Sequence, residues 1–323
     1  MLTRRVFTGA AVSGMASSLR AAERPFLQLE TAEAVVRFDL LGGGLVDFHL
    51  RDAHNLNPFS WESKGEPMQP RPRGHFLCMD RWGQPSEAEK KNGMPFHGEA
   101  PFAVWKHTGK GRMEAELPMA QLRVEREARL TGASLVVVER VTNIGKLGRM
   151  YNMVQHPSIA PPFLDEETFV DANAGAGFAQ SEPRTTLLVD NVRMLTSDPN
   201  PNVTSFPVHA EVGWVTATSP KQQLLVGYVW DSAHYPWLNL WRHVENGRPA
   251  ARGLEFGTTG LHQPFAEMVR IGGRMLDRPL FAYIDAGETQ ERGYRAFLRK
   301  VDAGVKKVSN VRVSATGEVQ ITF

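Results

Sequence analysis

Residues 122–130 read LRVEREARL, and residues 135–141 read LVVVERV. In these stretches apolar side chains alternate with polar ones or form a β-branched run, and a two-residue period is typical of a strand with one buried face. Similar short runs occupy residues 34–41, 212–218, 224–230, 279–284, 311–313 and 319–323. The sequence therefore predicts a protein built mainly of β-strands.

Clusters of Gly, Pro, Asn and Asp separate these runs, as at residues 42–44, 70–74, 198–202 and 245–249. Such clusters favour turns over long helices. One short helix is expected at residues 86–92, where Ser86 can cap the first turn and Glu89 stands three positions later, as in a capping box. Gly93 can close its end. We therefore predict an all-β fold, a large antiparallel β-sandwich, with this helix in a loop.

The composition limits the classes of function. Of the 323 residues, 42% are hydrophobic and 22% charged, which is ordinary for a folded globular protein. The net charge is +2 and no dense basic run follows the N-terminus, so a nucleic-acid partner is not expected. The sole cysteine, Cys78, excludes an intramolecular disulfide and a multi-cysteine metal site. It is expected in a strand as a small apolar residue, with a reactive role as the alternative.

The first 22 residues have the features of an export signal. Thr3-Arg4-Arg5-Val6-Phe7 precedes a mildly apolar stretch at residues 9–19, an order similar to a twin-arginine signal, with Thr8 in place of the usual large apolar residue. The stretch is shorter than the roughly 20 apolar residues of a spanning helix, so no stable membrane anchor is expected. Residues 1–22 are predicted to direct the protein to the periplasm and to be removed near residues 19–23. The alternative is a cytoplasmic tail.

The rest of the chain, residues 23–323, shows no internal repeat, no low-complexity linker and no change of composition. All-β folds of this length often form one domain. A single domain is therefore expected in preference to two.

Three loop-like segments place an ionisable side chain beside glycine or proline. They are PFHGE at residues 95–99 with His97, VQHP at residues 154–157 with His156, and GLEFGTT at residues 253–259 with Glu255. Each residue alone could be a turn residue or a satisfied structural partner. A histidine changes charge near neutral pH and a carboxylate can accept a proton, so together they can supply an acid and a base. That pairing suits the chemistry of a sugar hemiacetal.

The order of these segments resembles the aldose 1-epimerase (galactose mutarotase-like) family, in which a His-Gly motif, a His-Pro motif and a Leu-Glu strand end furnish the sugar site. Residues 141–145, VTNIG, and 285–289, DAGET, are similar to that family's Thr-Asn-x-Gly strand end and Pro-Gly-Glu turn. The resemblance implies a galactose mutarotase-like supersandwich. It also implies Glu255 as the base, His156 as the acid and His97 as a substrate-binding residue, with no metal or redox cofactor.

The departures from the family concern substrate binding. The usual His-Pro-Tyr-Phe continues here as His156-Pro157-Ser158-Ile159, which leaves the substrate preference open. Arg81 is the nearest counterpart of a substrate-binding arginine, and Asp231 is the preferred aspartate, with a strand-end turn role as its alternative. Trp237 or Trp241 is expected to pack on the sugar, although tryptophans of a sandwich are more often core residues.

These features predict an exported, carbohydrate-binding isomerase, similar to aldose 1-epimerases, whose ligand is a sugar or oligosaccharide. Glu255 would take the proton of the C1 hydroxyl as His156 protonates the ring oxygen. One alternative is an exported protein on the same fold that binds carbohydrate without catalysis or acts on polysaccharide. Another is a structural sandwich that binds other proteins, in which His97, His156 and Glu255 would lie scattered.

Overall fold

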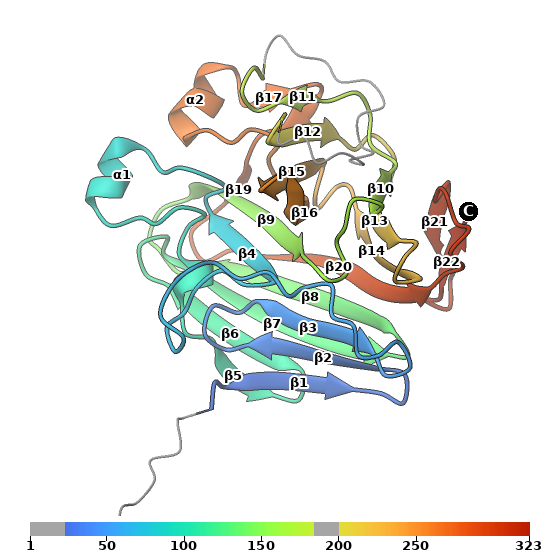
Figure 1. Cartoon of the computed structure of the whole chain (residues 1–323). Helices are drawn as coiled ribbons and strands as arrows, with labels where there is room; N and C mark the ends of the chain where they lie inside the picture. Colours follow the sequence, from blue (N-terminus) through green and yellow to red (C-terminus); the bar gives the residue numbers. More distant parts are fainter. Residues whose placement is uncertain (1–22, 184–199) are drawn as a thin grey trace, which may run out of the picture.

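The computed structural model describes residues 23–183 and 200–323, and strands predominate in both ranges (Figure 1). The predicted signal segment, residues 1–22, lies outside the described residues. Two large antiparallel sheets bury one extensive apolar core, so the predicted all-β sandwich is confirmed.

The first sheet has ten strands in the order β1-β2-β3-β4-β9-β16-β15-β12-β11, with β19 paired to β9. Their bounds are β1 Phe26–Glu30, β2 Ala34–Asp39, β3 Leu45–Leu50, β4 His75–Asp80, β9 Arg149–Ile159, β11 Phe178–Ala179, β12 Val203–Pro207, β15 Trp237–Glu245, β16 Arg248–Gly257 and β19 Ala282–Ile284. Strands β4, β9 and β16 are distant in the chain and adjacent in this sheet, so residues from three separate segments meet there.

The second sheet has eight strands in the order β10-β13-β14-β20-β8-β7-β6-β5. Their bounds are β5 Lys106–Gly109, β6 Arg112–Leu117, β7 Leu122–Thr131, β8 Ser134–Asn143, β10 Phe169–Ala172, β13 Val212–Ser219, β14 Leu224–Asp231 and β20 Thr289–Lys300. Two small hairpins pair β17 Arg274–Met275 with β18 Arg278–Pro279 and β21 Asn310–Val313 with β22 Val319–Thr322. The strand expected at residues 279–284 is split between β18 and β19, and Leu280, which lies between them, packs in a separate apolar cluster.

The helices are short: α1 Glu87–Lys91, the 3-10 helix η1 Ala100–Phe102, and α2 Phe265–Arg270. The predicted capping box of α1 is confirmed, because the Ser86 side chain accepts from the Glu89 N–H and the Glu89 carboxylate accepts from the Ser86 N–H. Cys78 is buried in β4, as expected. Figure 1 shows α1 and α2 at one end of the molecule, away from the β21–β22 hairpin. Within the described ranges, no helix combines the length and apolarity needed to cross a bilayer.

The β7–β8 hairpin carries two charged side chains on its core-facing side. Val124 and Ala128 of β7 are buried in the core, and Arg126 lies between them on the same face. Arg126 stands opposite Glu139 of β8, and its Nε and Nη2 lie 2.7 Å from Glu139 Oε1. Gln155 Nε2 of β9 donates to Glu139 Oε2 at 2.6 Å. The buried ion pair therefore links the second sheet to the centre of the first.

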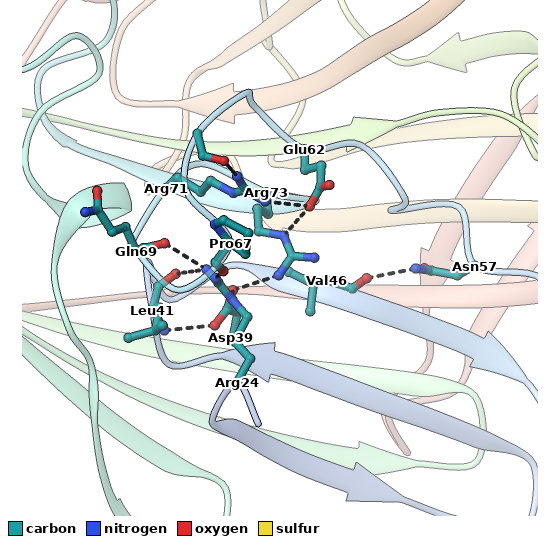
Figure 2. A network of polar contacts seen from close by, with 11 residues as sticks. Arg24, Asp39, Leu41, Val46, Asn57, Glu62, Pro67, Gln69, Arg71 and Arg73 are labelled. Carbon is teal, nitrogen blue, oxygen red and sulfur yellow. Dashed lines mark hydrogen bonds and ion pairs between the residues drawn. The ribbon is translucent and has the colours of Figure 1, made fainter. Parts of the chain in front are cut away.

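A second polar network fastens the connection between β3 and β4 to strand β2 (Figure 2). The buried Asp39 carboxylate accepts from Arg24 Nε at 2.5 Å and from Arg73 Nη1 at 3.1 Å. Arg73 Nε also lies 2.9 Å from Glu62 Oε2. The network therefore fixes the first described residues and the segment next to Trp61.

Candidate active site

A row of side chains from neighbouring strands lies on the outward face of the first sheet. Phe76 of β4 stands opposite His156 of β9. Phe256 of β16 stands opposite Gln155, so the same register places Glu255 opposite His156. Side chains alternate along a strand, and Phe256 lies in the core, so Glu255 and His156 point away from the core.

Glu255 and His156 are in direct contact. His156 Nε2 lies 3.1 Å from Glu255 Oε1, and the Trp82 indole N–H donates to Glu255 Oε2 at 2.6 Å. His156 Nδ1 lies 3.0 Å from Ser158 Oγ. Glu255 and His156 are only 1% and 5% exposed. Both carboxyl oxygens and both ring nitrogens therefore have partners inside the protein.

Burial controls the protonation of this pair. Because burial disfavours the charged form of each group, it raises the pKa of Glu255 from 4.5 to about 8 and lowers the pKa of His156 from 6.5 to about 3. Trp82 opposes part of the shift by hydrogen bonding to the carboxylate. Near neutral pH the pair therefore holds one proton, with Glu255 protonated and His156 neutral.

His97 approaches the pair from the loop before η1. Its Nδ1 accepts from the Gly83 N–H at 3.1 Å, so the neutral ring carries its proton on Nε2. Its ring centre lies 5.3 Å from that of His156, and burial lowers the pKa of His97 well below its usual range. The backbone is left-handed at His97 and Gly98, with φ of 67° and 76°, and a Cβ on Gly98 would lie 1.9 Å from Met79 O. The close approach of this loop to β4 therefore requires the glycine of the His-Gly motif.

His262 lies beside Trp82 and His97 and was not predicted from the sequence. Its ring centre lies 4.7 Å from that of Trp82 and 6.0 Å from that of His97, and burial lowers its pKa to about 4. A Cβ on Gly83 would lie 2.3 Å from the His262 ring, so glycine makes this approach possible. Gln180 Oε1 accepts from the His262 N–H at 3.0 Å and holds the segment in place.

The row continues beyond Glu255 with neutral polar side chains. Asn239 of β15 stands opposite Glu255, and Ser205 of β12 stands opposite Asn239. Ser205 Oγ donates to Asn239 Oδ1 at 2.6 Å, and Asn239 Nδ2 donates to Thr259 O at 3.0 Å. Within residues 23–183 and 200–323, the Glu255 carboxyl has no lysine or arginine partner. Its immediate surroundings are therefore neutral.

Arg81 and Asp231, the predicted substrate-binding arginine and aspartate, contact residues outside this row. The Arg81 guanidinium contacts the Glu89 carboxylate of α1 and lies over the Phe265 ring of α2, 4.3 Å from its centre, so it connects the two helices. Asp231 ends β14 in the second sheet, and its carboxylate accepts from the Ala233 N–H at 2.8 Å. The structure therefore does not bring Asp231 into the row, and it gives that residue the strand-end turn contact named as its alternative.

Of the two tryptophans considered from the sequence, Trp241 reaches the row and Trp237 does not. Trp237 is fully buried, and its indole N–H donates to Pro279 O at 2.6 Å. It packs with Met268 of α2 in a cluster separate from the main core. Trp241 is half-buried, with its ring centre 5.8 Å from that of His156.

The Glu255–His156 pair can donate one proton and accept one proton at adjacent atoms. It lies in a cluster of aromatic side chains: His97, His156, His262, Trp82 and Trp241. His97, His156 and Glu255, the three residues predicted from the sequence motifs, lie together. In the described part of the chain, no group of three or more His, Cys, Asp or Glu side chains is arranged to hold a metal ion.

Neither a protein-family model nor a curated protein sequence matches the chain. Solved structures do match. The Slr1438 protein from Synechocystis sp. PCC 6803 is 14% identical, with a TM-score of 0.64 over 86% of this chain and 97% of that one. A galactose mutarotase related enzyme from Lactobacillus acidophilus is 12% identical, with a TM-score of 0.64 over 88% of this chain and 100% of the other. A galactose mutarotase-like protein from Lactobacillus casei is 13% identical, with a TM-score of 0.61 over 85% and 100% of the two chains. At such identities the similarity shows the fold alone, and the chain has the galactose mutarotase-like fold.

Proposed function

We propose that this chain, which has the galactose mutarotase-like fold, binds a sugar at the Glu255–His156 pair and interconverts its anomers. The observation that carries the proposal is the 3.1 Å contact between a buried carboxyl and a buried imidazole. Burial raises the pKa of the carboxyl and lowers the pKa of the imidazole, so the pair is expected to hold one proton near neutral pH. Anomer interconversion needs one group that takes a proton and one that gives a proton. A singly protonated pair has the required number of protons.

The reaction begins with transfer of the shared proton from Glu255 to His156, against the preference that burial gives the ligand-free pair, and this transfer gives a carboxylate and an imidazolium. The C1 hydroxyl and ring oxygen of the sugar then replace the direct bond between the two groups. The carboxylate takes the hydroxyl proton, the imidazolium protonates the ring oxygen, and the bond between C1 and the ring oxygen breaks to give the open-chain aldehyde. Rotation about C1–C2 and reversal of these steps close the ring as the other anomer.

Neighbouring residues support binding and orientation. Trp82 holds one oxygen of Glu255, which leaves the other for the substrate. His97 has its Nδ1 occupied by the Gly83 N–H and offers its Nε2–H to a sugar oxygen. His262 is half-buried beside Trp82 and offers a further neutral imidazole for a sugar hydroxyl.

Variants of the pair test this function. We expect Glu255→Gln and His156→Asn to fold normally and to lower the rate of anomer exchange by about 10²–10⁴-fold, because each keeps hydrogen bonding and loses proton transfer. Exchange is measured by polarimetry or NMR on freshly dissolved monosaccharides, and the wild-type rate should hold between about pH 3 and pH 8, where the pair carries one proton.

Glu245→Gln is the matched control. Glu245 also contacts a histidine, His243 at 2.9 Å, but that pair is exposed, so this variant should keep full activity. Wild-type protein that binds sugars yet accelerates exchange for none of a broad panel would reject catalysis and favour a non-catalytic carbohydrate-binding protein.

We also propose that residues 1–22 direct export to the periplasm through the paired Arg4 and Arg5. Twin-arginine signals are recognised by a receptor and not through charge alone, so replacing both arginines with lysine should leave the protein in the cytoplasm. Cell fractionation measures the result. Unchanged periplasmic protein in the double variant would reject the twin-arginine assignment.

A further inference from the structure

Aromatic rings extend from His156 along the outer face of the first sheet. The Phe76 ring is stacked on His156 with centres 4.2 Å apart and planes at 19°, and the Trp61 ring is stacked on Phe76 at 5.9 Å and 26°. The Trp241 ring makes edge-on contacts with two rings of this stack. Its ring centre lies 5.7 Å from Trp61 at 80° and 5.8 Å from His156 at 61°. The two tryptophans therefore form a corner beside the proposed catalytic pair.

This corner is separate from the core between the sheets. Phe76 belongs to a small apolar cluster that includes Cys78 and Val154, and Trp61 packs on its edge. Phe76 is buried, whereas Trp61 and Trp241 are only half-buried and keep part of their indole surface in water. Flat indole surfaces that remain partly exposed next to polar groups are suited to the apolar C–H faces of sugars.

The segment that carries Trp61 is fixed before any ligand binds. The Gly74 N–H donates to Trp61 O at 2.8 Å, and residues Glu62 and Arg73 form an antiparallel bridge. Arg73 also contacts Glu62 and the buried Asp39 through its side chain (Figure 2). A site held in place in this way loses less conformational entropy when a ligand binds.

We propose that Trp61 and Trp241 form a second sugar subsite, so that the ligand is an oligosaccharide whose reducing-end ring lies at the Glu255–His156 pair. This inference rests on the proposed function. Two successive ring stacks separate Trp61 from His156, a separation that suits the next sugar of a chain better than the ring at the pair. Trp241 lies near both rings and borders both subsites.

Titration calorimetry with reducing monosaccharides and the corresponding reducing disaccharides tests the subsite, with anomer exchange at the reducing end followed by NMR. We expect the wild type to bind a matching disaccharide about tenfold more tightly than its monosaccharide, a gain on the order of one aromatic contact. Trp61→Ala should reduce this ratio to about one. Trp61→Leu keeps an apolar side chain against Phe76 without a flat ring and should reduce the ratio equally. Tyr283→Ala removes another exposed aromatic ring, from β19, and should leave the ratio unchanged.

The outcomes separate this inference from the proposed function. A disaccharide preference that depends on Trp61, in a protein that accelerates no anomer exchange, supports the subsite and rejects catalysis. Monosaccharide exchange without any disaccharide preference supports catalysis and overturns the subsite. A disaccharide preference that is unchanged in both Trp61→Ala and Trp61→Leu also overturns the subsite.

Discussion

Glu139 and Glu255 are both buried carboxyl groups, 0% and 1% exposed, but they have different partners. Arg126 donates from Nε to Glu139 inside the core and forms an ion pair with it through Nη2. Glu255 contacts an indole N–H and the imidazole of His156, and neither carries a charge near neutral pH. A guanidinium balances the charge of a buried carboxylate. When the partners are neutral, burial favours the protonated form of the carboxyl group. The comparison distinguishes a carboxylate that links two sheets from a carboxyl group that is ready to exchange a proton.

The largest expected difference between the two sites is in stability. Arg126→Met leaves Glu139 buried without its cation and should lower the free energy of unfolding by about 3–5 kcal/mol. Glu255→Gln should lower it little at pH 7, because the amide replaces a carboxyl that is already neutral. Urea denaturation at pH 7 measures both variants. Equal losses would show that the two carboxyl groups are held in the same way.

The pH dependence of stability should show a smaller effect that belongs to the site alone. Between about pH 4.5 and 6.5, Glu255 is protonated in the folded protein and His156 is protonated in the unfolded chain. The pair therefore holds one proton in each state, and its two contributions to the pH dependence of the free energy of unfolding cancel. From pH 6.5 to about 8 only the folded protein keeps a proton, so the free energy of unfolding should fall by about 1.4 kcal/mol per pH unit. Below pH 4.5 the unfolded chain binds two protons and stability falls again.

Thermal or urea unfolding across pH 5–8 measures this dependence against Glu255→Gln. The variant lacks the ionising carboxyl and should lose the decline above pH 6.5. A decline of the same slope in both proteins would assign it to other groups.

A third buried carboxylate, Asp39, should give the smallest effect on stability. It contacts two guanidinium groups, from Arg24 and Arg73. Arg24→Ala removes one and leaves the other, so we expect a loss of about 1–2 kcal/mol, less than for Arg126→Met. Chemical denaturation measures it. A loss as large as that of Arg126→Met would mean that Arg73 alone does not balance Asp39.

The fold was predictable because burial of one strand face leaves a local pattern in the sequence. Residues 122–141 show that pattern clearly, and β7 and β8 follow it. The exceptions are Arg126 and Glu139, which occupy core-facing positions among apolar residues. Their contact depends on the register between strands, which sequence periodicity does not specify.

The candidate site was predictable where its residues lie in short motifs. His97 precedes a glycine, His156 precedes a proline and Glu255 lies two residues from a glycine on each side, and the fold brings the three together. His262 also lies two residues from a glycine and from a proline, but that context did not single it out, and its place in the site depends on the fold around Gly83.

Trp237 and Trp241 illustrate a different limit of sequence reasoning. They are four residues apart in β15, so their side chains share one face of the sheet. Trp237 packs with Met268 of α2, whereas Trp241 stays half-buried beside His156. Which tryptophan is covered depends on a segment that follows them by more than twenty residues, so local sequence does not distinguish them.

The short hydrogen bond from Trp82 to Glu255 also provides a spectroscopic probe. An indole proton held 2.6 Å from a carboxyl oxygen, donor to acceptor, is strongly deshielded and shifts when the charge of that oxygen changes. Among the seven tryptophans, its ¹H resonance can be assigned by its loss in Trp82→Phe. That single resonance should titrate with Glu255 near pH 8 and should move again when a bound sugar takes the place of His156. It therefore reports ionisation and ligand entry in the intact protein, without any need to observe turnover.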